Sequence, residues 1–282
     1  MPPTRAAVVS ATCALTTTSV TSCIACSSTT TRSRTRARTG PTRRCRSPAP
    51  SGPSSIGWAP GSRSGRAITC SSSAAAGAAW RSTRAYPWCR VTAITLSREH
   101  DDRARARGHA AGLAERVTIQ LRDYREVTGT FDKLVSIEML EAIGYAFLPD
   151  YFAACARVLR PGGPFALQSI TMPDARFESY RKRVDWMQTY IFPGSLIPSQ
   201  GAIARAATNA GFTITRADDI GPDYVPTLRA WRANFVAALP TVRALGFDDT
   251  FVRTWLLYLA FSEAAFAERT LGNHQLLLTS RA

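Results

Sequence analysis

The sequence predicts an α/β protein with a doubly wound, mostly parallel sheet over residues 89–282. Short apolar runs that suit buried strands alternate with stretches of helical pattern, and this alternation is typical of parallel sheets. Residues 176–209 form a mainly helical insertion, and two late strands around long helices predict a sheet that closes with an antiparallel strand. The predicted strands are 91–96, 117–121, 131–138, 165–170, 212–217 and 274–279.

Local signals place helices between these strands. Ser97 is a candidate N-cap for a helix that ends at about Gly112, because a serine oxygen accepts a backbone N–H of the first turn and glycine suits a helix stop. The sequence R-P-G-G at 160–163 is a turn that ends a helix over 148–159. The other predicted helices cover about 227–239 and 249–267.

The first ninety residues have a composition unlike that of the rest of the chain. They hold thirteen Arg, no Lys, no Asp or Glu and six of the seven Cys, so +13 of the formal net charge of +15 lies here. Three interpretations fit: a basic arm that neutralises nucleic-acid phosphates, an Arg- and Ser-rich transit peptide, or an out-of-frame translation. We favour the third and expect no nucleic-acid partner.

The genetic code tests the out-of-frame hypothesis. When the third base of each codon is joined to the first two of the next, residues 10–30 can be read as RDMRAHYDLGNELYRLFLDD and residues 66–84 as SDHVLEFGCGWGGLAIHA. Both readings hold acids and alternating apolar residues, and the second is a strand that enters a Gly-rich turn typical of nucleotide-binding α/β folds. Residues 1–85 are therefore interpreted as an out-of-frame translation, with the true frame resuming before Cys89.

This hypothesis has structural consequences for the printed chain. Residues 1–88 are expected to be a disordered, low-complexity segment, because their composition buries too little apolar surface to offset the entropy of ordering. Residues 89–282 are expected to form an incomplete domain. Its N-terminal strand and glycine loop would be missing, which leaves a gap beside strand 91–96.

Composition also argues against several other kinds of protein. No apolar run approaches the roughly 18 residues that cross a bilayer, and no secretory signal pattern opens the chain. Cys155 is the one Cys beyond Cys89, which indicates a reducing, cytoplasmic setting without a disulfide framework. The Cys23 and Cys26 pair has no second pair at zinc-ligand spacing, so no metal site is expected.

From about Cys89 to its end, the chain resembles one enzyme family. The segments that carry the resemblance are CRVTAITLSREH, LRDYREVTGTFDKLVSIEMLEAIG, RVLRPGGPFALQSITMPDARFESY, YIFPGSLIPS and IGPDYVPTLRAWRANF. Together they resemble the cyclopropane-fatty-acyl-phospholipid synthases and the related mycolic acid cyclopropane synthases, which depend on S-adenosylmethionine. The resemblance implies a Rossmann-like class I methyltransferase fold. It also implies methyl transfer to a cis double bond of a phospholipid acyl chain, followed by ring closure.

The resemblance further implies a catalytic site that holds bicarbonate, which takes a proton from the carbocation on the acyl chain. By position, Glu141 and Tyr224 correspond to bicarbonate contacts, and Ile170 would offer its backbone N–H. Gln168 stands where many members have His, and it donates hydrogen bonds but carries no proton in this pH range. Without the resemblance, Glu141 is more simply a helix N-terminal acid and Tyr224 a core or rim residue.

S-adenosylmethionine is the implied cofactor. Thr95 and Ser97 follow the second family strand, where the family contacts ribose and methionine, and His100 replaces the usual Gln. Asp123 and Tyr124 match the turn that binds adenine. The Gly-rich loop and the family's N-terminal Tyr-Ser-Cys segment are absent from the printed frame, so the cofactor site is expected to lack one wall.

Two other functions remain open from the sequence. A methyltransferase that leaves a methyl branch, or that acts on another lipid or small molecule, would differ in product mass. A non-catalytic remnant is the alternative that the missing glycine loop favours. The expected partner is a phospholipid at a membrane surface, with the protein cytoplasmic and peripheral to the inner face of the membrane.

Overall fold

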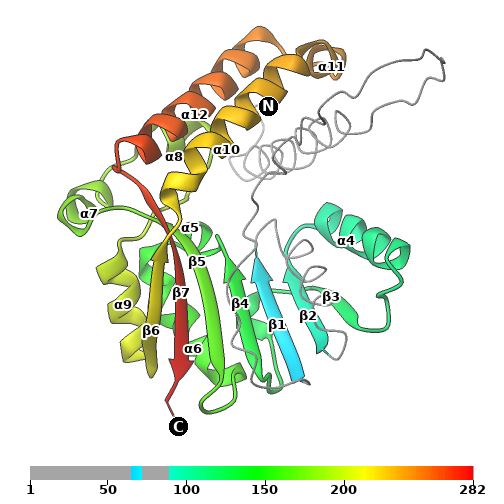
Figure 1. Cartoon of the computed structure of the whole chain (residues 1–282), viewed down its shortest axis with the longest axis vertical. Helices are drawn as coiled ribbons and strands as arrows, with labels where there is room; N and C mark the ends of the chain where they lie inside the picture. Colours follow the sequence, from blue (N-terminus) through cyan, green and yellow to red (C-terminus); the bar gives the residue numbers. More distant parts are fainter. Residues whose placement is uncertain (1–64, 72–88, 282) are drawn as a thin grey trace, which may run out of the picture.

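The chain folds around one seven-stranded sheet, seen in a computed structural model that describes residues 65–71 and 89–281 (Figure 1). Its strands run in the order β3-β2-β1-β4-β5-β7-β6. Strand β7 is antiparallel to both of its neighbours, as the sequence predicted, and the other neighbouring pairs are parallel. The strands are β1 (Gly65–Ser71), β2 (Cys89–Thr95), β3 (Val117–Leu121), β4 (Lys133–Ile137), β5 (Pro164–Thr171), β6 (Phe212–Asp219) and β7 (Gly272–Ser280).

Strand β1 corrects the prediction that strand 91–96 borders a gap. It pairs in parallel with β2 on one side, from Gly65 opposite Cys89, and with β4 on the other, from Ala67 opposite Lys133. Pairing in a sheet uses backbone groups, so a segment in the printed frame can fill the position that the two neighbouring strands leave. The remaining residues predicted to be disordered, 1–64 and 72–88, lie outside the described residues.

The helices match the predicted pattern closely. Ser97 caps α4 as expected, because its Oγ accepts a hydrogen bond from the backbone N–H of His100 at 3.2 Å. The turn after α6 contains Gly162 at φ +70°, a backbone conformation that favours glycine. The helices are α4 (Arg98–Ala110), α5 (Leu140–Ile143), α6 (Leu148–Val158), α7 (Asp174–Tyr180), α8 (Trp186–Tyr190), α9 (Gln200–Asn209), α10 (Gly221–Ala237), α11 (Leu239–Ala244) and α12 (Asp249–Ala267), with 3-10 turns at Tyr124–Glu126 and Tyr145–Phe147.

A separate helical layer lies beyond the carboxyl ends of the parallel strands. Figure 1 shows α8, α10 and α12 gathered there, at the top of the view, and α10 packs along α12. These helices share an apolar cluster built from Ile191, Leu228, Phe235, Val242, Val252, Trp255, Leu259 and Phe266, which we call the helical-layer cluster. No helix in the described part of the chain has both the length and the hydropathy needed to cross a membrane.

Aromatic side chains form the centre of the main core between α6 and the sheet. Phe165 of β5 is fully buried and lies with its ring centroid 6.3 Å from that of Phe152 and 5.6 Å from that of Phe212. Tyr151 of α6 packs edge-on against Phe152 at 5.3 Å. This cluster ties α6 to β5 and β6, and therefore fixes the strands that carry the candidate site.

Truncating Phe165 is expected to destabilise the fold strongly. Phe165→Ala should lower the free energy of unfolding by about 3–5 kcal/mol, because it removes a buried ring and leaves a cavity. Urea unfolding followed by circular dichroism measures this. Phe261→Ala is the matched control, since Phe261 is 52% exposed. Equal losses in the two variants would contradict the assignment of Phe165 to the core.

Candidate functional site

The candidate catalytic site begins at Glu138, directly after the carboxyl end of β4. Glu138 has φ 51°, a left-handed backbone conformation that is uncommon for a residue other than glycine. Its backbone N–H donates to the carbonyl oxygen of Gln168 at 2.8 Å, which holds the residue beside β5. Strained backbone of this kind concentrates at functional sites, where the surrounding structure maintains it.

Three side-chain donors converge on one oxygen of Glu138. Gln168 Nε2 donates to Glu138 Oε1 at 3.0 Å and Asn273 Nδ2 donates to the same oxygen at 2.8 Å. The Tyr224 hydroxyl also donates to Glu138 Oε1, and Gln168 Nε2 lies 3.3 Å from the Tyr224 hydroxyl oxygen. Gln275 Nε2 donates to Gln168 Oε1 at 2.9 Å and so fixes the Gln168 amide with its nitrogen toward Glu138. The arrangement suits a carboxylate anion.

Glu141, on the short helix α5, forms the second carboxyl of the site. Its Oε1 accepts from the backbone N–H of Ile170 at 2.5 Å and from Ser169 Oγ at 3.0 Å, whereas its buried Oε2 has no hydrogen-bond partner among the described residues. Burial, together with the nearby Glu138 carboxylate, raises the pKa of Glu141 to about 8. Glu141 is therefore mainly protonated at neutral pH.

Two tyrosines near the carboxyl pair stay protonated. Burial, followed by the charge of Glu138, raises the pKa of Tyr224 well above its usual value. The same two causes raise the pKa of Tyr258 to about 12. Both hydroxyls therefore remain neutral over the range in which proteins function, and Tyr224 acts as a hydrogen-bond donor to Glu138.

The structure brings together all four residues expected at the catalytic site. Gln168 and Tyr224 meet at Glu138, while Glu141 and Ile170 bond directly on the adjacent stretch of β5. Sequence reasoning missed Glu138. The available signal was an acid as the last residue of a predicted parallel strand, at the sheet edge where ligands bind in open α/β folds.

Bicarbonate does not fit this arrangement of residues. Of the groups expected to hold it, Tyr224 and Gln168 donate to Glu138, and the Ile170 N–H donates to Glu141. A bicarbonate ion at these donors would displace a protein carboxylate from its hydrogen bonds and add a like charge beside it, which is unfavourable in a buried site. The expectation of a bicarbonate site is therefore not supported by the geometry.

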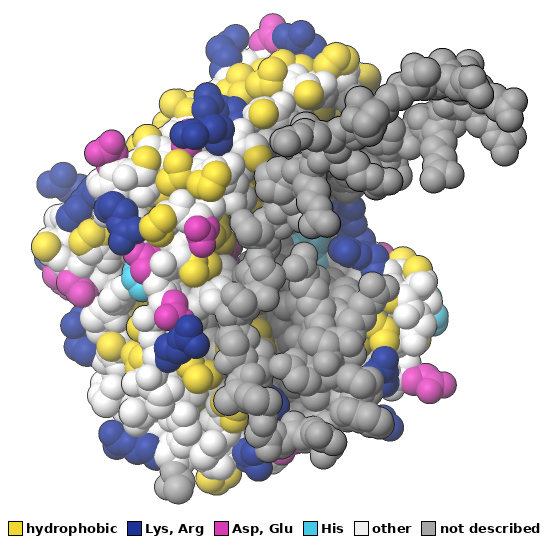
Figure 2. Space-filling view, in the orientation of Figure 1, with side chains coloured by type: hydrophobic (Ala, Val, Ile, Leu, Met, Phe, Trp, Pro, Cys, Tyr) yellow, Lys and Arg dark blue, Asp and Glu magenta, His cyan; other side chains and the backbone are white. Residues whose placement is uncertain are grey.

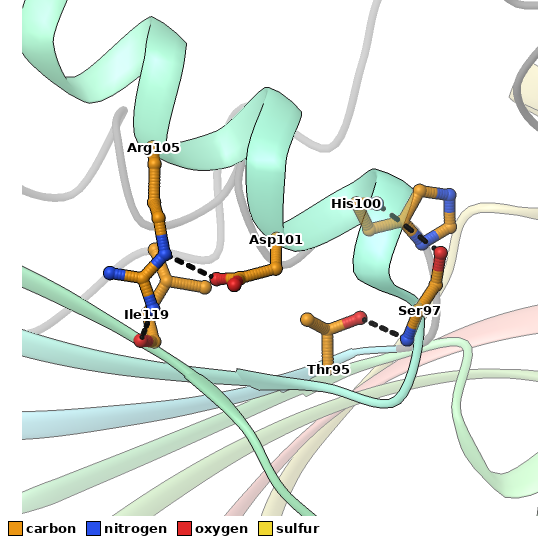
Figure 3. Close-up of polar contacts among 6 residues, drawn as sticks. All are labelled: Thr95, Ser97, His100, Asp101, Arg105 and Ile119. Carbon is orange, nitrogen blue, oxygen red and sulfur yellow. Dashed lines mark hydrogen bonds and ion pairs between the residues drawn. The ribbon is translucent and has the colours of Figure 1, made fainter.

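The residues expected to bind the cofactor line the carboxyl ends of β2 and β3. Figure 3 shows Thr95 and Ser97 at the end of β2, with the backbone N–H of Ser97 donating to Thr95 Oγ1 at 3.2 Å and His100 in the first turn of α4. Asp101 and Arg105, one turn apart on α4, form an ion pair with an N···O distance of 2.8 Å. Arg105 also donates to the Ile119 carbonyl of β3, which ties α4 to the sheet below the site.

Asp123 and Tyr124 follow β3 on the same edge. The Asp123 carboxylate accepts from the backbone N–H and the guanidinium of Arg125, and this hydrogen bond to the Arg125 side chain lowers the pKa of Asp123. Tyr124 is half-buried, with its ring edge-on to Tyr151 at 5.5 Å. These residues thus lie at the edge that binds nucleotides in doubly wound sheets, a position that suits S-adenosylmethionine. The segment after β1, where a glycine loop would lie, is outside the described residues.

No group of three or more His, Cys, Asp or Glu side chains placed to hold a metal ion occurs in the ranges 65–71 and 89–281. The polar side chains of this site are the carboxyl pair and its hydrogen-bond donors. Those residues lie where β4, β5 and β7 meet the helical layer, because Ile170 and Tyr224 also pack against the helical-layer cluster.

The sheet order and this carboxyl-edge site define an α/β fold of the class I S-adenosylmethionine-dependent methyltransferases. The cyclopropane synthase MmaA2 from Mycobacterium tuberculosis has a similar structure, with a TM-score of 0.68 at 21% identity over 76% of this chain and 78% of that one. The mycolic acid cyclopropane synthase CmaA1, in a complex with SAH and CTAB, gives a TM-score of 0.67 at 22% identity over the same shares of the two chains.

The chain belongs to the mycolic acid cyclopropane synthetase family, whose family model matches residues 76–276. Tuberculostearic acid methyltransferase UfaA1 of Mycobacterium tuberculosis is 46% identical over 186 residues, which are 66% of this chain and 44% of that protein. The cyclopropane-fatty-acyl-phospholipid synthase of Escherichia coli is 34% identical over 190 residues, 67% of this chain and 47% of that protein. The chain thus spans about half the length of these curated relatives.

Proposed function

We propose that this chain is the catalytic part of an S-adenosylmethionine-dependent methyltransferase that places a methyl branch on a phospholipid acyl chain. The observation that carries the proposal is the 46% identity to a tuberculostearic acid methyltransferase, against 34% to a cyclopropane-fatty-acyl-phospholipid synthase. The ring-forming reaction is the second candidate, favoured by the E. coli relative and by the family's name. The main expectation from the sequence, ring closure, thus gives way to its alternative.

The cofactor edge supports methyl transfer. Bound S-adenosylmethionine would supply an electrophilic methyl group to the double bond. Thr95, Ser97, His100, Asp123 and Tyr124 would bind it, because polar groups at the carboxyl ends of β2 and β3 face the position that nucleotides take in this fold. The relative solved in complex with SAH supports the same cofactor.

The helical layer supports an acyl substrate. Tyr224 packs its ring against Phe266 with a centroid distance of 5.0 Å, and Phe192 packs edge-on against Tyr258 at 5.6 Å. Aromatic and aliphatic side chains therefore continue from the carboxyl pair into the helical-layer cluster. An apolar, water-poor surrounding is what a carbocation on an acyl chain requires, and aromatic faces stabilise a nearby cation.

A membrane surface is the proposed source of the acyl chain. Figure 2 shows hydrophobic side chains exposed over the helices at the top of the view. Among the exposed hydrophobic side chains of the chain, Trp231 and Val236 lie on α10 and Leu257 and Phe261 lie on α12, with exposed fractions between 38% and 52%. Exposed apolar side chains on a helical layer beside the site support contact with a lipid surface.

Product analysis tests the proposed function. The chain carrying the alternate frame over residues 1–85 is incubated with labelled S-adenosylmethionine and unsaturated phospholipid vesicles. The expected product is a methyl-branched acyl chain. The assay contains no reductant, so loss of a proton leaves the methyl-branched chain with one double bond and the same mass as the cyclopropane. An unsaturated branch keeps a double bond, which ozonolysis cleaves and a cyclopropane lacks.

A product that is predominantly cyclopropane would replace the first candidate by the second. Absence of label in the lipid, in a folded protein that binds the cofactor, would contradict both. Vesicles of fully saturated phospholipid are the substrate control, since they offer no double bond to the methyl group.

A further inference from the structure

We propose that the Glu138 carboxylate is the built-in base of this site and takes the place of a bound bicarbonate ion. The proposal rests on the proposed function, because the proton it removes comes from the methylated acyl chain. It assigns a role to Glu138, for which the resemblance implied none. It also removes the need for bicarbonate as a co-reactant.

The hydrogen-bond donors of the site are already bonded to protein carboxylates. An anion-binding site needs donors, and Tyr224, Gln168 and Asn273 all converge on Glu138 Oε1. The neighbouring donors, Ser169 Oγ and the Ile170 N–H, are engaged by Glu141. A second anion would therefore find the donors of this site already committed to protein carboxylates.

The net charge of the Glu138 and Glu141 pair also supports the proposal. Glu141 is fully buried, and burial holds its proton at neutral pH, so the pair presents one negative charge rather than two. The Tyr224 hydroxyl donates to Glu138, and Tyr224 packs against the helical-layer cluster, so that carboxylate lies beside a residue that borders the cluster. The site thus holds one carboxylate beside the proposed acyl region, which is the charge state a general base requires.

The identity of Gln168 fits the same assignment. A glutamine cannot carry a proton, but it can orient a carboxylate through its Nε2. Gln275 fixes the Gln168 amide in that orientation by donating to its Oε1 at 2.9 Å. With a base supplied by Glu138, the proton-carrying His found in many family members is not required at position 168.

The proposed step balances without a further reactant. The π electrons of the acyl double bond form the new C–C bond as the C–S bond of the methyl donor breaks. A carboxylate oxygen of Glu138 then takes a proton from carbon, and the C–H electron pair closes the remaining valence as a double bond or a ring. Glu138 is left neutral and returns its proton to water when the product leaves.

Direct binding of ¹³C-labelled bicarbonate to the full chain tests the proposal without any need for activity. The wild-type chain and Glu138→Gln should show no binding by ¹³C NMR, because the side chain still fills the donors. Glu138→Gly should gain binding, and glycine suits the left-handed φ of 51° at this position. Glu115→Gly is the matched control, since Glu115 is an exposed turn residue.

Kinetics of the frame-restored enzyme provide the second readout. The wild-type rate should be independent of bicarbonate. Glu138→Gln and Glu138→Gly should each lose about a hundredfold or more in rate, and added bicarbonate should restore only the glycine variant. A merely structural role for Glu138 would not produce this selective rescue.

Bicarbonate binding by the wild-type chain, or a wild-type rate that rises with bicarbonate, would overturn the proposal. So would full activity of Glu138→Gln. If no variant methylates lipid, the proposed function fails, while the NMR comparison still decides whether Glu138 occupies the anion site.

Discussion

Restoring the alternate reading frame over residues 1–85 is expected to raise lipid methylation by about a thousandfold or more over the printed chain. The expected loss in the printed chain is one of cofactor affinity, where about 4 kcal/mol of binding free energy corresponds to a thousandfold. The residues from Ser71 to Ala79 read SSSAAAGAA in the printed frame, with one glycine, whereas the alternate frame has several. A Gly-rich turn lets the backbone approach the nucleotide closely, and added Cβ atoms prevent this.

The position of β1 makes this expectation specific. Strand β1 ends at Ser71 in the middle of the sheet, between β2 and β4, at the same carboxyl edge as the cofactor residues that follow β2 and β3. Both versions are to be incubated with labelled S-adenosylmethionine and unsaturated phospholipid vesicles. Equal label transfer by the two chains would refute the out-of-frame hypothesis. Sequencing the coding DNA around codons 1 and 85 is the independent control.

Substituting Glu141 by glutamine is expected to remove a large pH dependence of stability. The pKa of Glu141 is raised from 4.5 to about 8 in the folded protein, so the folded state holds this proton more tightly than the unfolded state. The contribution of Glu141 to the free energy of unfolding is fully present below about pH 4.5 and is lost as the pH rises through about 8. The loss amounts to roughly 4–5 kcal/mol. Because glutamine does not ionise, Glu141→Gln should not lose stability in this way as the pH rises.

Urea unfolding of the wild type and of Glu141→Gln over this pH range measures the difference. The variant should gain stability relative to the wild type as the pH rises, because an ionised Glu141 would place a second charge beside Glu138. Glu178→Gln is the matched control: Glu178 is exposed and its pKa is lowered by a hydrogen bond from Arg181. A constant difference between wild type and Glu141→Gln at all pH values would contradict the raised pKa.

Much of the fold could be predicted from the sequence because its signals are local. The apolar run 117–121 is β3 to the residue, and the cap at Ser97 opens α4 as expected. The antiparallel final strand followed from two late strands around long helices and is confirmed in β7. Strand β1 was missed because the pattern of residues 65–71 is weak, and because its pairing with β2 and β4 joins segments that lie apart in the sequence.

The candidate site, too, was predictable only where its signals are local. The resemblance to a known family supplied Glu141, Gln168, Ile170 and Tyr224, each from its local segment. Glu138 lies in the same segment as Glu141, but its role depends on Asn273, which is 135 positions away, and on Tyr224, which is 86 positions away. Local patterns do not specify such pairs.

The sequence by itself thus determined the α/β class, the family and the edge of the sheet where the chemistry lies, because periodicity, caps and short motifs are properties of neighbouring residues. Only the tertiary structure decided that a printed-frame strand completes the sheet and that Glu138 takes the donors expected for a bicarbonate ion. Both depend on which groups from distant segments meet, and hydrogen-bond partners are settled when β4, β5, β7 and α10 pack together.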